Sequence, residues 1–121
     1  LIAVMERVRE SFNVNALGLV AAEAALGDVG HLQASIAGNS VQREALADAL
    51  RARGMKVAPS QTNFLLVEFG DHSSRIEARL VGRGVVLRPM GGYGLGECLR
   101  ITVGTEAENQ RLLAALDEVM K

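Results

Sequence analysis

The spacing of apolar residues predicts helices over most of the chain. These residues recur every three or four positions, which is typical of a helix with one buried face. The predicted helical segments are the opening LIAVMERVRE, ALGLVAAEAALG up to Gly27, a long helix from His31 to Arg53, a short one around Ile76 and Leu80, and a last one after Thr105. Arg-Gly pairs close two of these helices, in keeping with the basic last turn and glycine stop of a helix.

Two of these helices carry further signals. Thr105 and Glu108 predict a capping box, in which the threonine hydroxyl caps the first turn and the glutamate reaches back. The long helix should turn an apolar stripe toward the core. The members of that stripe are Leu32, Ile36, Ala45, Leu46, Ala49 and Leu50.

Strand patterns occur in NFLLVEF, VVLRP and ECLRITVGT. In the last of these, strict alternation places three aliphatic residues on one face and puts Arg100 on the other, between Cys98 and Thr102. The element order is helix, helix, strand, helix, strand, strand, helix. This order predicts an α+β fold, with helices on one face of a small, mostly antiparallel sheet of three to four strands. The long helix before the sheet has the length of one that joins two domains.

Length, charge and cysteine content restrict the class of protein. With 121 residues, 49% of them hydrophobic, the chain can bury one core. Its 13 basic and 14 acidic residues nearly balance without a basic run, so neither nucleic acid nor an anionic membrane is an expected partner. Cys98 is the single cysteine, which excludes an internal disulfide and favours a reducing cytoplasm. Residues 14–26 are too short and too interrupted by polar groups to span a bilayer.

The first residues, LIAVMERVRE, start without an initiator methionine and in the middle of an amphipathic pattern. Their apolar run has no basic lead and no cleavage site, and it is too short for a signal peptide. We therefore interpret the beginning of the chain as a cut end.

Several motifs lack the context that their chemistry needs. The glycine loop GGYGLGE precedes a strand, whereas phosphate-binding glycines open a helix, so we interpret it as a turn or a flexible loop beside a site. His31 and His72 have no carboxylate or cysteine at ligand spacing, and we expect no metal site and no histidine-based triad. No serine lies in a nucleophile elbow, and Cys98 has no base partner in sequence.

Two arginines stand at the ends of neighbouring predicted strands. Arg88 ends VVLRP and Arg100 lies near the start of the next strand, and the short loop between them makes the strands neighbours in space. Two guanidiniums at one sheet edge form a site for anions, because the planar fork binds a carboxylate or a phosphate bidentately. Long basic side chains on a solvated sheet face give the same pattern. The residues alone leave both interpretations open.

The segments SFNVNALGLVAAEAAL, PSQTNFLLVEF and GVVLRPMGGYGLGECLRITVGTEAENQRLLAAL resemble, in this order and at these spacings, the C-terminal part of the histidinol-phosphate aminotransferase family. This family is a branch of the pyridoxal-phosphate-dependent aminotransferases of fold type I. The resemblance covers nearly the whole chain and is most specific from Gly84 to Leu116. It implies a small C-terminal domain that closes over the substrate.

The resemblance also implies roles for individual residues. Arg100 matches the arginine that binds the carboxylate of the amino-acid donor, and Arg88 matches an arginine that helps to hold the substrate phosphate. Asn15, in a family motif near the domain interface, and Tyr93 are further candidates for lining the site. Asn63 recurs in the family as well, and we interpret it as shaping the entry into its strand.

The family's cofactor, pyridoxal 5′-phosphate, is held as a lysine Schiff base in a large domain. Lys56 and Lys121 lack the glycine-rich Ser-Lys context of that lysine, so we expect no catalytic lysine, no cofactor site and no activity in this chain alone. Residues 1–27 should join the missing N-terminal cofactor domain, and residues 28–121 should form the small domain. The resemblance implies an intact cytoplasmic homodimer that exchanges an amino group between histidinol phosphate and 2-oxoglutarate in histidine biosynthesis.

Rival hypotheses remain at this point. An aromatic amino-acid aminotransferase or a threonine-phosphate decarboxylase on the same scaffold would share most of these motifs. Arg88 discriminates between phosphorylated and aromatic substrates, because a phosphate would bind its guanidinium and an aromatic substrate would prefer apolar walls. From another class, the chain could be a free-standing α+β module that senses an anionic metabolite. A domain that is separated from its partner and merely folds would instead expose the apolar face of ALGLVAAEAALG and self-associate.

Overall fold

The computed structural model describes all 121 residues. The chain divides into two compact units, residues 1–35 and residues 36–121. The helix α3 runs from Val29 to Ala52 and contributes residues to both units. Because the second unit contains the sheet and the core, it is the part of the fold that positions a site.

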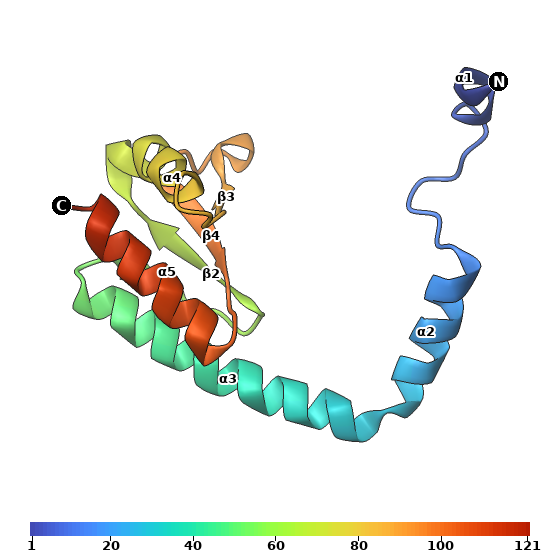
Figure 1. The fold of residues 1–121 in the computed structure, drawn as a ribbon, viewed down its shortest axis with the longest axis horizontal. Coiled ribbons are helices and arrows are strands. Elements are labelled where there is room, and N and C mark those ends of the chain that lie inside the picture. The colour runs from blue at the N-terminus through green and yellow to red at the C-terminus, as the bar shows by residue number, and fades with distance from the viewer. The chain divides into compact units, whose positions relative to one another are not determined.

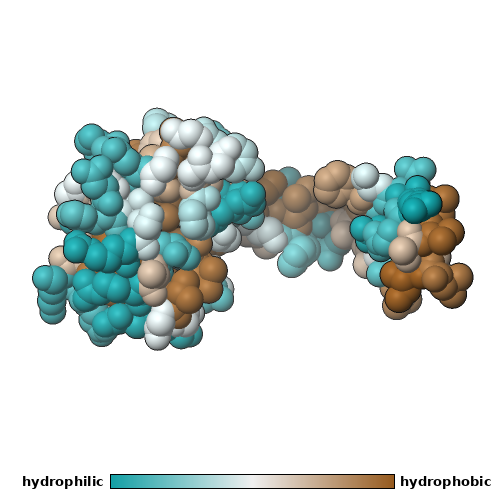
Figure 2. Space-filling model, turned by 90° about the horizontal axis from the view of Figure 1, so that it is seen from above, coloured by the Kyte–Doolittle hydropathy of each residue, from teal (hydrophilic) through white to brown (hydrophobic).

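Residues 1–35 form helices without a core of their own. They comprise α1 (Ile2–Met5), α2 (Ala16–Gly27) and the first turns of α3. None of these residues is buried, and brown apolar side chains gather on their surface (Figure 2). Helix α2 has apolar residues on all sides, which is typical of a helix that is enclosed in its working state.

Residues 36–121 form a four-stranded antiparallel sheet in the order β1-β2-β4-β3. The strands are β1 (Lys56–Val57), β2 (Phe64–Glu68), β3 (Arg88–Pro89) and β4 (Cys98–Thr102). Short 3-10 turns, η1 (Gly70–His72) and η2 (Gly91–Tyr93), lie between elements, and α4 (Ser73–Val81) and α5 (Glu106–Val119) complete the unit. Figure 1 shows the helices of this unit beside the sheet.

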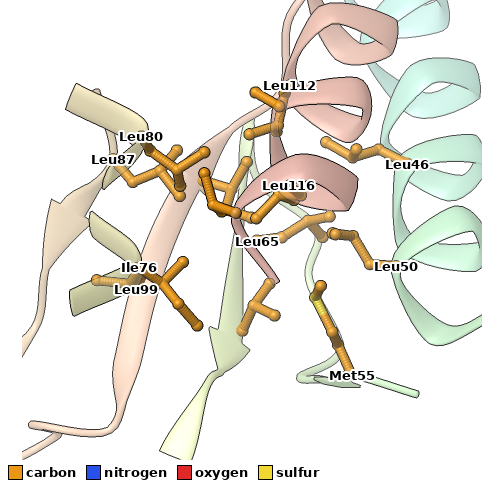
Figure 3. Packing of buried hydrophobic residues seen from close by; sticks show 14 of the residues in the cluster. Leu46, Leu50, Met55, Leu65, Ile76, Leu80, Leu87, Leu99, Leu112 and Leu116 are labelled. Carbon is orange, nitrogen blue, oxygen red and sulfur yellow. The ribbon is translucent and has the colours of Figure 1, made fainter. Parts of the chain in front are cut away.

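One face of the two central strands, β2 and β4, forms one side of the hydrophobic core. Leu65 and Val67 of β2 and Leu99 and Ile101 of β4 are almost completely buried, because alternate residues of each strand point to the same side. Leu46 and Leu50 of α3, Leu80 of α4 and Leu116 of α5 pack against them in the same cluster (Figure 3). All three helices therefore cover the same face, and the opposite face of the sheet stays open.

The ends of the helices are joined by arginine contacts. Arg53, just after α3, donates from Nε and Nη2 to the two carboxylate oxygens of Asp117 on α5, at 2.7 and 2.8 Å. These hydrogen bonds raise the pKa of Arg53 and lower the pKa of Asp117. Arg79 of α4 donates to the backbone carbonyl of Val119, so α4 is attached to the end of the same helix.

The predicted α+β class, the antiparallel sheet and the single covered face are confirmed. The capping box is confirmed as well, since Thr105 accepts from the Glu108 amide and Glu108 accepts from the Thr105 amide at 2.8 Å. The long helix begins at Val29 and not at His31, because the Asp28 carboxylate accepts from the His31 amide and caps an earlier turn.

The predicted stripe of the long helix is only partly correct. Leu46 and Leu50 are buried, but Ala45 is exposed and Ala47 and Arg43 are buried in its place. The buried residues lie in the second half of α3, where that helix contacts the sheet. Leu32 and Ile36, in the first half, are more than half exposed.

The predicted strand VVLRP is also shorter than expected, because β3 contains only Arg88 and Pro89. The amide of Val85 donates to the carbonyl of Leu80 at the end of α4, and Val86 is exposed. The backbone amide of Val85 therefore takes part in ending α4 and is not available to pair with β4. No helix in the structure combines the length and the apolar character that crossing a membrane requires.

Candidate functional site

The open face of the sheet carries the candidate residues. Phe64, Leu66 and Glu68 of β2 and Cys98, Arg100 and Thr102 of β4 all point away from the core, because they alternate with buried neighbours. The register places Arg100 directly opposite Arg88 of β3 on one side and Leu66 of β2 on the other. The prediction that Arg100 lies on the non-core face is confirmed.

Arg100 is half-buried and lies over an aromatic ring. Its Cζ atom is 5.0 Å from the centre of the Phe64 ring, which is within the range of a cation–π contact. Its Nε is buried and has no hydrogen-bond partner. A buried N–H without a partner is costly, and the guanidinium has no hydrogen-bond partner in the chain, so it is suited to donate to an oxygen atom of a ligand.

Arg88 is exposed and is accompanied by Tyr93. Its Cζ lies 5.9 Å from the centre of the Tyr93 ring, and its Nη2 donates to the tyrosine hydroxyl at 3.3 Å. The turn η2 brings Tyr93 back toward β3, and Gly94 closes that turn with a φ of 75°, a conformation that favours glycine. Part of the predicted glycine loop therefore places a hydroxyl beside an arginine.

Neither arginine is neutralised within the chain. The ion pairs of the structure involve other residues, and the carboxylate on this face, Glu68, accepts from Lys56 at 2.7 Å. That contact raises the pKa of Lys56. Like charges directly opposite each other across a sheet are destabilising, so the Arg88–Arg100 pair favours an anion that binds between or beside them.

Sequence patterns missed Phe64 as part of this site. The prediction treated NFLLVEF as a largely buried strand, without assigning its first aromatic residue to a face. The alternation that gives Arg100 its face does the same for Phe64, because antiparallel pairing joins Phe64 to Thr102. The signal was present, but it required the register between strands that are far apart in the sequence.

The turn after β4 is fixed by side chains. Asn109 of α5 is buried, accepts from the Gly104 amide at 3.0 Å and donates to the Gly104 carbonyl at 3.1 Å. It also donates to Oε1 of Gln42 on α3. A Cβ at Gly104 would come within 2.9 Å of Glu108, so only glycine fits there. The hydrogen bonds from Thr105 lower the pKa of Glu108. These contacts determine where β4 ends and α5 begins.

The remaining predicted residues have other environments. Asn15 belongs to residues 1–35 and caps α2 by accepting from the Gly18 amide at 2.8 Å. The carbonyl of Asn63 accepts from the Val103 amide at 2.8 Å, at the entry into β2. Cys98 is a half-buried free thiol opposite Glu68. Of the four predicted binding or lining residues, the sheet unit brings together Arg88, Arg100 and Tyr93, and a role for Asn15 in the site stays a prediction.

Residues 1–116 match the family model described as aminotransferase class I and II. Among curated relatives, the chain is 46% identical to histidinol-phosphate aminotransferase 1 of Thiobacillus denitrificans and 42% identical to histidinol-phosphate aminotransferase 2 of Methylococcus capsulatus. Each match covers 96% of this chain but only 30% and 31% of the relative, so the chain spans about a third of their length.

A solved structure is similar over nearly the whole chain. Histidinol-phosphate aminotransferase from Sinorhizobium meliloti, in complex with pyridoxal-5′-phosphate, matches with a TM-score of 0.80 and 31% identity. The match covers 97% of this chain and 33% of that one. The family model and the solved relative therefore both match this chain to aminotransferases.

Proposed function

The chain belongs to the class I and II aminotransferases, and from this premise we propose that it supplies the substrate-anion site of a histidinol-phosphate aminotransferase. The observation that carries the proposal is the pair Arg88 and Arg100, opposite each other on an open sheet face and without a carboxylate partner. The names of the relatives support the substrate assignment. The intact enzyme exchanges an amino group between histidinol phosphate and 2-oxoglutarate.

Arg100 binds the carboxylate of the amino-acid donor. Its half-buried position above Phe64 leaves the guanidinium N–H groups free, and a bidentate carboxylate satisfies two of them in a fixed plane. Fixing that plane orients the amino group of the donor toward the reacting centre. Arg88, next to the hydroxyl of Tyr93, binds the phosphate of the phosphorylated partner.

The lysines of this chain do not fit the covalent attachment of pyridoxal phosphate. Lys56 is exposed and is hydrogen-bonded to Glu68, which raises its pKa and keeps the amine protonated, whereas attachment needs a neutral amine. Lys121 lies after α5 and is exposed, with no neighbouring group that would favour its neutral form. We therefore assign the cofactor, which supplies the electron sink of transamination, to a part of the enzyme outside these residues.

The exposed apolar side chains of residues 1–35 support the proposal that this chain is part of a larger enzyme. Large exposed apolar surfaces mark interaction sites, and α2 carries apolar residues on all sides with Glu23 as its one charged residue. In the intact protein we assign this surface to contacts with the cofactor domain and with a second copy in a cytoplasmic homodimer.

The proposal is tested with the intact protein that contains this chain. Purified protein is supplied with glutamate as donor, and either imidazole-acetol phosphate or the aromatic keto acid phenylpyruvate as acceptor. We expect kcat/KM for the phosphorylated acceptor to be higher by at least about a hundredfold, because a site built around Arg88 leaves that charge unpaired with an aromatic substrate. Equal or better use of phenylpyruvate contradicts the proposal and favours an aromatic aminotransferase.

A further inference from the structure

The contact between Phe64 and Arg100 follows from the register of the sheet. Phe64 pairs with Thr102, and Arg100 pairs with Leu66, so the ring and the guanidinium are diagonal neighbours on the open face. Diagonal neighbours on two strands are within reach when one side chain is aromatic and the other is long. The 5.0 Å distance from Arg100 Cζ to the ring centre shows that they use this reach.

The Arg100 guanidinium makes no hydrogen bond within the chain, and its Nε is buried without a partner. A carboxylate neighbour would also hold the guanidinium in place, but it would occupy the N–H groups and cancel the charge. An aromatic face attracts the cation through its quadrupole and leaves the N–H groups in the guanidinium plane free. The ring therefore orients Arg100 without competing with a ligand.

Phe64 is itself held in place from several directions. Its carbonyl accepts from the Ser60 hydroxyl at 2.6 Å and from the Thr62 hydroxyl at 3.3 Å. The carbonyl of Thr62 in turn accepts from Nδ2 of Asn39 at 3.2 Å and from Nη1 of Arg43 at 3.4 Å, both on α3. The turn before β2 is thus attached to the long helix, and the start of the strand that carries the ring is fixed.

We infer that Phe64 is a positioning residue that holds the Arg100 guanidinium in the orientation in which it binds a substrate carboxylate. The inference rests on the proposed function, since it assigns a carboxylate to Arg100. Loss of the aromatic face should weaken carboxylate binding by a few-fold to about thirtyfold, the range expected of a cation–π contact. Phosphate binding at Arg88 should be unaffected, because Arg88 lies against Tyr93.

The test uses the intact protein and three variants. Phe64→Leu removes the aromatic face and keeps an apolar side chain, and Phe64→Tyr restores the face. Phe69→Leu is the matched control, because Phe69 packs against the core and makes no cation–π contact with Arg88 or Arg100. The inhibition constants of glutarate and of inorganic phosphate are measured for each, together with KM and kcat for glutamate. Phe64→Met replaces Phe64→Leu if that variant does not fold by circular dichroism.

The expected result is selective. Phe64→Leu binds glutarate about tenfold more weakly than the parent and has a higher KM for glutamate. Its inhibition constant for inorganic phosphate changes less than twofold. Phe64→Tyr and Phe69→Leu behave like the parent. Unchanged glutarate binding, equal losses for glutarate and phosphate, or no rescue by tyrosine overturns the inference. A parent protein that fails to bind glutarate overturns the proposed function itself, which separates the two failures.

Discussion

Arg88 and Arg100 are cross-strand partners on β3 and β4, and each guanidinium lies against an aromatic ring in place of a carboxylate. Tyr93 accompanies the first and Phe64 the second. Opposed like charges cost stability in a sheet, and a surface that needed only solubility would have no reason to retain them. The proposed function accounts for the pair, since it gives Arg100 a substrate carboxylate and Arg88 a substrate phosphate to bind.

Replacement of Arg88 tests the specificity for phosphate. Arg88→Gln keeps a hydrogen-bonding side chain and removes the charge, so kcat/KM for the phosphorylated acceptor should fall by about tenfold to a hundredfold, as expected for the loss of a hydrogen bond to a charged group. The KM for glutamate should change little. Steady-state kinetics of the intact enzyme checks both values, and an equal loss on the two substrates would show that Arg88 does not discriminate.

The sequence predicted those parts of the fold that depend on residues close together in the chain. Strict alternation placed Leu99 and Ile101 in the core and Arg100 outside it, and the spacing of Thr105 and Glu108 placed the start of α5. The contact of Phe64 with Arg100 was missed because it depends on the pairing of β2 with β4, which are separated by a helix and a third strand. Local patterns do not specify that register.

The shortened β3 and the incorrect stripe of α3 have different origins. The strand prediction for VVLRP took no account of the end of α4, where the Val85 amide donates to the Leu80 carbonyl. The buried stripe of α3 instead follows the helical repeat. Ala47 lies three residues before Leu50 and shares its buried face, whereas Ala45 does not.

The core predicts unequal effects for two adjacent residues of α4. Leu80 is completely buried and Val81 is about half exposed. Leu80→Ala should reduce the free energy of unfolding by about 2–5 kcal/mol, because it removes buried methyl groups and leaves a cavity. Val81→Ala should cost less than about 1 kcal/mol. Urea denaturation measures both, and similar costs would mean that α4 does not pack as described.

Acid should weaken the attachment of α5 to α3. The hydrogen bonds from Arg53 lower the pKa of Asp117 in the folded state, so their contribution is present above the ordinary aspartate pKa of about 4 and is lost as the pH falls through the lowered value. Glu108 behaves in the same way through its contacts with Thr105. The thermal midpoint should therefore fall between about pH 5 and pH 2, and less steeply in Asp117→Asn. If the thermal midpoint of Asp117→Asn fell as steeply with pH as that of the parent, Asp117 would not contribute to the loss of stability in acid.

The central claim, that Arg100 binds the donor carboxylate, is tested most directly by the kinetics of Arg100→Lys in the intact enzyme. Lysine keeps the charge but lacks the planar fork and reaches the ligand as a point charge. We predict that KM for glutamate rises and that kcat/KM falls by about tenfold or more, as expected for the loss of one hydrogen bond of the bidentate fork to a charged group. Parent-like kinetics with glutamate in this variant would contradict the assignment of the carboxylate to Arg100.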